Sequence, residues 1–169
     1  MLVLFVFGVK AHPNDEMGTD LHKKVTDACR DDWFRGKIFF VEGYDIRIAR
    51  HLVQGVDVWL NNPRRPLEAT GTSGEKVVAN GVLNLSVSDG WWVEGYKQDA
   101  GWALPLEQSF DIQELQDELD AEAIYSILEN EIVPAYYYRN DKNIPVLWVD
   151  FIKNTLAEVA PQFTTKRIV

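Results

Sequence analysis

Short apolar runs alternate with segments of helical periodicity along the first half of the chain, and this alternation limits the fold more than any other feature. The apolar runs predict strands at 2–7, 37–44, 56–60 and 81–87. Apolar residues at helical spacing predict helices between these runs. Strands and helices in this order are typical of a parallel sheet, because parallel strands need crossover connections that pack on the sheet. We therefore expect an α/β, doubly wound domain with four parallel strands and helices on both faces.

The last third of the chain predicts helices only. An apolar stripe from Leu115 to Ile132 predicts one long or two consecutive amphipathic helices that end at Pro134. A second stripe predicts a final helix from about 145 to 160, which Pro161 should stop. We treat 1–169 as one domain or part of one, with a helical segment from about 111 onward.

Charge and cysteine content exclude several classes of protein. A net charge of −9 argues against general nucleic-acid binding, which needs a basic surface. The single cysteine, Cys29, excludes an internal disulfide, and no CxxC or His/Cys cluster resembles a zinc site. We therefore expect no metal and a reduced, cytoplasmic setting. The apolar start is too short to span a bilayer and lacks the flanks of a signal peptide, so we expect no membrane partner.

A strand of central type that begins at the second residue leaves no room for a preceding edge strand. We expect the chain to be a piece of a longer protein.

The segment EATGTSGEK, residues 68–76, follows the third predicted strand. The carboxyl end of a parallel strand is where open α/β sheets bind ligands. Gly71 allows a close backbone approach, and a helix beginning at Thr72 or Ser73 would point its free amides at an anion such as phosphate. A second interpretation stays open, because residues 72–75 have the form of a capping box, which needs no ligand.

Two stretches carry a resemblance to a known family: YDIRIARHLVQGVDVWLNNPRRPLEATGTSGEKVVANGVLNLSVSDGWWVEGY and the terminal PQFTTKRIV. They resemble the alpha-glucan phosphorylases, which degrade glycogen, starch and maltodextrins with inorganic phosphate and use pyridoxal phosphate. The similarity is greatest to the short bacterial and archaeal branch and extends over essentially the whole chain. It implies a Rossmann-like carboxyl-terminal portion of a two-domain glycosyltransferase of GT-B architecture.

The resemblance also implies site residues, most specifically through EATGTSGEK. In the family, the last lysine of this motif carries the cofactor as a Schiff base, and the turn before it presents amides to the cofactor's phosphate. The implied residues are Lys76 as catalytic anchor, Gly71, Thr72, Ser73 and Tyr44 around the cofactor, and Glu68, Thr70 and Gly71 at the hydroxyls of the glucosyl unit. Glu75 departs from the family, which has an apolar residue there.

The partners implied are an alpha-1,4-glucan and inorganic phosphate, with glucose 1-phosphate as the product. In the family mechanism the cofactor's phosphate exchanges a proton with inorganic phosphate, which protonates the glycosidic oxygen and then attacks the sugar with retention. The basic segment that grips both phosphates and the amino-terminal half lie upstream in that family. We expect them to be missing here and the isolated chain to be inactive. Whether the intact enzyme is a homo-oligomer stays open.

Two alternative functions stay open. A retaining nucleotide-sugar glycosyltransferase of the glycogen synthase type has a second glutamate eight positions after the first. In this chain that position is Lys76, and Glu75 is one residue short, which favours the phosphorylase. The other alternative is a non-catalytic folded fragment.

Two pairs of residues have competing interpretations. Arg64 and Arg65 form a basic spot that suits either a phosphate or glucan contact or a solvent-facing loop. Trp91 and Trp92 are expected in core or loop packing rather than stacked on sugar rings.

Overall fold

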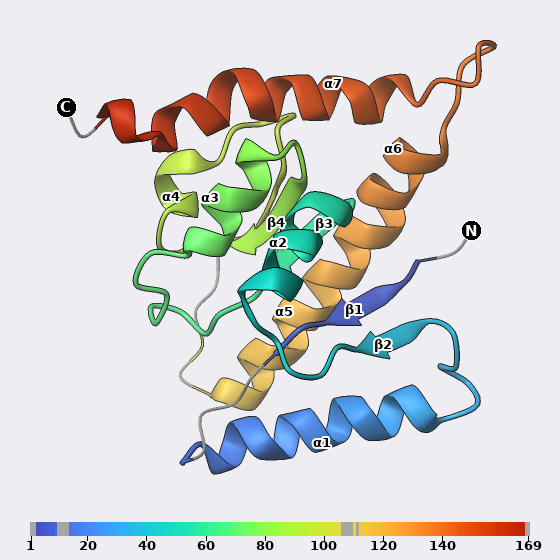
Figure 1. The fold of residues 1–169 in the computed structure, drawn as a ribbon, viewed down its shortest axis with the longest axis vertical. Coiled ribbons are helices and arrows are strands. Elements are labelled where there is room, and N and C mark those ends of the chain that lie inside the picture. Colours follow the sequence, from blue (N-terminus) through green and yellow to red (C-terminus); the bar gives the residue numbers. More distant parts are fainter. Residues whose placement is uncertain (1–2, 10–13, 106–109, 111, 168–169) are drawn as a thin grey trace. The chain divides into compact units, whose positions relative to one another are not determined.

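The computed structural model describes residues 3–9, 14–105, 110 and 112–167, and its chain divides into two compact units (Figure 1). The first unit is Met1–Leu52 and the second is Val53–Val169. Helix α2 (Ile46–Gly55) crosses the boundary between them.

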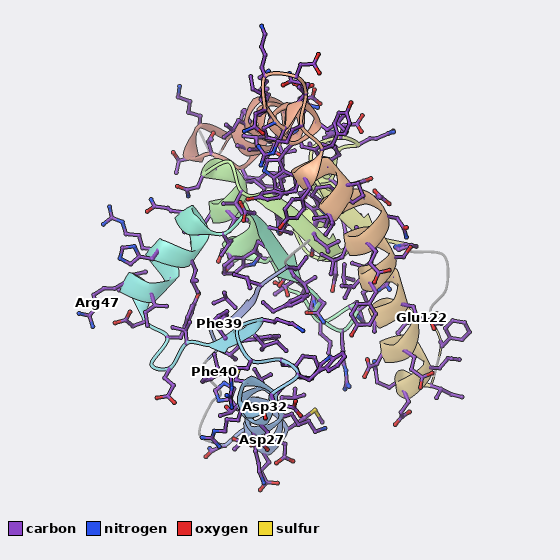
Figure 2. All side chains as sticks on the ribbon, turned by 90° about the vertical axis from the view of Figure 1, so that its right-hand side faces the viewer. Asp27, Asp32, Phe39, Phe40, Arg47 and Glu122 are labelled. Atoms are coloured by element: carbon purple, nitrogen blue, oxygen red, sulfur yellow. The ribbon has the colours of Figure 1, made fainter. Side chains whose placement is uncertain are left out.

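The first unit contains a parallel strand pair and a covering helix. β1 (Phe5–Phe7) pairs in parallel with β2 (Ile38–Phe40), and α1 (Glu16–Arg30) connects them. Asp15 starts α1, because its carboxylate accepts a hydrogen bond from the Gly18 N–H at 2.8 Å. The ring of Phe40 meets His22 of α1 edge-on, and Figure 2 shows Phe40 on the α1 side of β2.

Asp45 organises the start of α2. Its carboxylate accepts hydrogen bonds from the backbone N–H groups of Ile48 and Arg47, both at 2.9 Å, and pairs with the exposed Arg47 guanidinium (Figure 2). The Ile48 bond first, and then Arg47, lower the pKa of Asp45 below its usual value. The carboxylate therefore stabilises the fold above the unfolded-state pKa, and this contribution is lost as the pH falls through the folded-state pKa.

The second unit is built on a three-stranded parallel sheet. β3 (Val58–Asn61), β4 (Leu83–Val87) and β5 (Trp102–Leu104) are hydrogen-bonded in that order. Every residue of the central strand β4 is buried, including the polar Asn84 and Ser86. Leu83 and Leu85 point to one face of the sheet, and Asn84 and Ser86 point to the other.

Helices cover both faces of this sheet, and each face has its own core (Figure 1). The face of Leu83 and Leu85 packs on α5 (Gln113–Ile127), the π-helical turn η1 (Leu128–Ile132), α6 (Val133–Tyr137) and α7 (Val146–Asn154). The opposite face packs on α3 (Thr72–Ala79), α4 (Trp92–Gly95) and the turns η2 (Thr155–Val159) and η3 (Ala160–Phe163). A last 3₁₀ turn, η4, spans Thr165–Arg167.

The predicted α/β class with parallel strands and covering helices is confirmed, but the prediction of one four-stranded sheet is wrong for the described residues. The four predicted strands lie in two sheets, and β5 is an additional strand. Strand patterns in a sequence indicate where longer strands form, but not which of them share a ladder. β5 (Trp102–Leu104) has only three residues, which is too short for a clear period-two pattern.

The predicted helix stop at Pro134 is wrong, whereas the predicted end of the final helix at about residue 160 is confirmed, because Ala160 is the C-cap residue of η2 and only a 3₁₀ turn follows. Proline disturbs a helix interior because it lacks an N–H group, but the first turn of a helix tolerates it. Pro134 falls in the first turn of α6, directly after the π-helical η1, so the helical path continues to Tyr137. Pro161 falls in η3, the short 3₁₀ turn that follows η2.

Within the described ranges, no helix combines the length and the apolar character needed to cross a membrane.

The buried position of β4 predicts a large cost for truncating Leu85, whose side chain is fully buried. We expect Leu85→Ala to lower the free energy of unfolding by about 2–5 kcal/mol, because the variant loses apolar burial and leaves a cavity. Urea unfolding followed by circular dichroism measures this change.

Leu147→Ala is the matched control, since Leu147 is 51% exposed. Its effect should stay within about 0.5 kcal/mol. Equal losses in the two variants would contradict the placement of Leu85 in the core.

Candidate functional site

Helix α3 begins in a tight turn that only glycine can make. Gly71 is its N-cap residue, with a left-handed φ of 88°. A Cβ atom at this position would lie 2.8 Å from Cδ1 of Trp91 and 3.0 Å from Oε1 of Glu68. Gly71 therefore meets two requirements at once, a positive φ and the absence of a side chain.

The capping-box interpretation of residues 72–75 is wrong, because the N-cap residue is Gly71 and not Thr72. No side chain makes a capping hydrogen bond at this end of α3. The Thr72 hydroxyl instead lies 3.4 Å from the Lys76 Nζ, which donates to it across one helical turn. The start of α3 thus keeps uncapped amides and the positive end of the helix dipole, both of which favour an anion.

An open pocket of about 410 Å³ adjoins this turn. Its lining consists of Asn61, Leu67, Glu68, Ala69, Thr70, Gly71, Thr72 and Ser73. Asn61 is the last residue of β3, so the pocket lies at the carboxyl end of a parallel strand. The structure therefore brings together five residues that the sequence suggested for one site: Glu68, Thr70, Gly71, Thr72 and Ser73.

Lys76 lies beside this pocket and not in its lining. Its side chain is exposed on α3 and reaches back toward the first turn, where its Nζ meets the hydroxyl of the pocket residue Thr72. Tyr44 belongs to the first unit, where a Cβ atom at Gly8 would lie 2.9 Å from its ring. Its role as a cofactor contact stays a prediction.

Sequence reasoning missed Asn61 as a pocket residue. Its amide nitrogen donates to the Ser86 hydroxyl at 3.3 Å across β3 and β4. The available signal was a polar residue immediately after the apolar run VDVWL, at the end of a predicted strand.

The two arginines that follow β3 are paired with acidic residues of α5. Arg64 Nη2 lies 2.9 Å from Asp117, and Arg65 Nη2 lies 3.1 Å from Asp120. Arg65 also donates to the carbonyl oxygen of Pro105. The basic spot is thus paired with carboxylates, while Arg64 lies on a loop with 47% of its side chain exposed; a phosphate or glucan contact stays a prediction.

Trp91 and Trp92 are core residues, as expected, because they are only 5% and 0% exposed. Among the described side chains, no group of three or more His, Cys, Asp or Glu residues could hold a metal ion.

The fold and this turn define a class of protein, namely an α/β protein with an uncapped helix start, of the kind that favours an anion, at the carboxyl end of a parallel strand. The chain is 45% identical over 167 residues to the glycogen phosphorylase of Aquifex aeolicus, which covers 99% of the chain and 24% of that protein. It is 47% identical over 167 residues to the maltodextrin phosphorylase of Thermococcus litoralis, covering 99% of the chain and 20% of that protein.

The glycogen phosphorylase of Mycobacterium bovis is 41% identical over 160 residues, which cover 95% of the chain and 18% of that protein. No family model matches the chain. The resemblance to the alpha-glucan phosphorylases is thus confirmed, and the chain corresponds to a part of these proteins. It spans between 18% and 24% of the length of these relatives.

The turn geometry predicts that Gly71→Ala destabilises the second unit more than another substitution at a left-handed glycine. Gly81, with a φ of 76°, is the matched control, because the nearest atom to its added Cβ lies 3.5 Å away. We expect Gly81→Ala to cost about 1–2 kcal/mol of backbone strain. Gly71→Ala should cost a further 1–3 kcal/mol or so through overpacking against Trp91.

Urea unfolding of both variants measures the difference. Equal costs would show that Trp91 does not restrict position 71.

Proposed function

We propose that this chain is the cofactor-binding, carboxyl-terminal part of an alpha-glucan phosphorylase, within a two-domain GT-B architecture. The enzyme would cleave an alpha-1,4-glucan with inorganic phosphate and release glucose 1-phosphate. One observation carries this proposal: the motif most specific to the family coincides with a pocket at an uncapped helix start. The names of the relatives, glycogen and maltodextrin phosphorylases, support the same substrate class.

The residues of the pocket fit pyridoxal phosphate. The first turn of α3 has no side-chain cap, so its amides are available to the cofactor's phosphate. Gly71 has no Cβ, which allows the phosphate to approach the backbone. Lys76 Nζ lies beside Thr72 of the same turn, where it would anchor the cofactor's aldehyde carbon. A volume of about 410 Å³ is within the usual range for small-molecule sites.

The chain's own residues would bind and orient the reactants. The amides of Thr72 and Ser73 would hold the cofactor's phosphate, and Lys76 would fix its other end. Glu68 and Thr70 would accept and donate hydrogen bonds to the hydroxyls of the glucosyl unit. When bound, the cofactor supplies a phosphate group that exchanges a proton with inorganic phosphate.

Glu75 does not contradict this assignment. Consecutive helical residues point about 100° apart around the axis, whereas residues four apart share a face. Lys76 and Thr72 share a face, as their 3.4 Å contact shows. The Glu75 carboxylate therefore projects from a different side of α3 than the proposed anchor.

The remaining parts of the active site would come from the rest of the protein. We place the basic segment that grips both phosphates, and the groups that close over the sugar, in an amino-terminal half. We also propose a cytoplasmic location, which agrees with a single cysteine. The glycogen synthase-type alternative is disfavoured by the register of Glu75 and Lys76 and by the names of the relatives.

The anchor assignment predicts a selective covalent label on Lys76. The full-length protein is incubated with pyridoxal 5′-phosphate, reduced with borohydride, digested and examined by mass spectrometry, because the isolated chain would lack the remaining phosphate ligands and hold the cofactor weakly. We expect a pyridoxyl group on the peptide that contains Lys76, and none on that peptide in Lys76→Ala. Pyridoxal without phosphate should need a roughly tenfold higher concentration, because it lacks the group that binds the amides.

Lys97→Ala is the matched control, since Lys97 is another exposed lysine of the second unit. It should leave the label on Lys76 unchanged. Equal labelling of Lys76 and Lys97, or equal labelling by pyridoxal with and without phosphate, would contradict the anchor assignment and favour the non-catalytic alternative.

The missing phosphate ligands predict that the isolated chain is inactive. Supplied with maltodextrin, inorganic phosphate and cofactor, it should release no glucose 1-phosphate, because positioning groups are absent. A coupled assay with the glycogen phosphorylase of Aquifex aeolicus as positive control measures this. Phosphorolysis by the isolated chain would show that no upstream half is required.

A further inference from the structure

The loop between β4 and α4 is tied to the pocket by hydrogen bonds. The Asp89 carboxylate accepts from the backbone N–H of Glu68 at 2.9 Å through Oδ2 and from the N–H of Gly90 at 2.9 Å through Oδ1. Two residues later, the Trp91 N–H donates to the carbonyl oxygen of Thr70 at 2.8 Å. Two pocket residues, Glu68 and Thr70, are therefore held through their backbones by residues that do not line the pocket.

The indole of Trp91 fills the space behind the glycine-rich turn. It lies so close to α3 that a Cβ at Gly74 would be 2.5 Å from its Nε1 and 2.7 Å from its Cζ2. The same ring leaves no space for a Cβ atom at position 71. The Trp91 Nε1 is buried and has no hydrogen-bond partner in the described part of the chain. The indole therefore contacts the turn by close packing and not through a hydrogen bond.

Phe163 of η3 also packs on this indole. The two ring centroids are 4.9 Å apart, and the rings meet edge to face at 87°. Phe163 is about ninety residues away from the turn in sequence, yet only one aromatic ring separates it from Gly71 and Gly74.

We propose that Asp89, Trp91 and Phe163 are positioning residues that hold residues 68–74 in the conformation that binds the anion. This inference rests on the proposed function for the identity of the ligand. It concerns a set of contacts, however, that exists in the chain without any ligand. A binding loop that is already in its bound conformation avoids the cost of ordering on binding, so losing these contacts weakens binding without removing any ligand contact.

The three residues make separable contributions. Asp89→Ala removes both acceptors, whereas Asp89→Asn keeps one oxygen. Trp91→Leu removes the ring behind the turn, and Phe163→Leu removes only the support of that ring. Trp148→Leu is the matched control, because Trp148 is also buried but belongs to the core on the opposite face of the sheet.

Hydrogen exchange of the ligand-free chain tests the positioning directly. We expect the amides of residues 68–74 to exchange at least roughly fivefold faster in Asp89→Ala and Trp91→Leu than in the unmodified chain, because the local opening becomes easier. Phe163→Leu and Asp89→Asn should have smaller effects in the same direction. Trp148→Leu should leave the exchange of these amides unchanged. Unchanged exchange in Asp89→Ala and Trp91→Leu, or equal acceleration in Trp148→Leu, would overturn the proposal.

Labelling of Lys76 by pyridoxal 5′-phosphate and borohydride tests the consequence for binding. The half-saturating cofactor concentration of the full-length protein should rise roughly fivefold or more in Asp89→Ala, the size expected from losing the one hydrogen bond that ties Asp89 to the pocket residue Glu68. Trp148→Leu should leave it unchanged. An unmodified full-length protein that forms no label on Lys76 would contradict the proposed function alone, and the exchange measurement would then decide the positioning role by itself.

Discussion

Burial of the central strand β4 on both faces is the constraint on which the second unit depends. Leu83 and Leu85 pack on α5 and α7, while the opposite face lies under α3 and the carboxyl-terminal turns. β4 pairs with β3 on one side and β5 on the other, so all three strands take their positions from it. This sheet also positions the pocket. Asn61, a pocket residue, ends β3, and Asp89, which accepts from the Glu68 N–H, follows β4.

The proposed site would let an acidic protein bind an anion through local groups. The net charge of −9 offers no general attraction for phosphate, and the nearby Arg64 and Arg65 are paired with carboxylates of α5. What remains are the uncapped amides at the start of α3, the helix dipole and the exposed Lys76, whose Nζ lies beside Thr72. The amides can meet an anion only in one backbone conformation, and Trp91 and Glu68 restrict that conformation at Gly71.

Sequence patterns predicted much of the framework. The positions of four strands, their parallel direction and a short helix near residues 73–80, observed as α3, followed from hydrophobic periodicity and from Gly71. Predictions of helix ends and caps went wrong where the same residue type is compatible with two local structures. Pro134 either stops a helix or begins the next turn, and Thr72 either caps a helix or accepts a hydrogen bond within it. Local sequence contains both possibilities, and only the surrounding chain selects one.

By itself, the sequence determined the α/β class, the order of the elements and the motif that places Glu68, Thr70 and Gly71 next to a helix start. These features depend on residues close together along the chain, where spacing and side-chain type are sufficient. The tertiary structure decided which strands share a sheet, that Arg64 and Arg65 meet α5, and that Trp91 lies behind the turn. Those contacts join residues tens of positions apart, so they depend on how the layers pack around β4 and leave no periodic signal in the sequence.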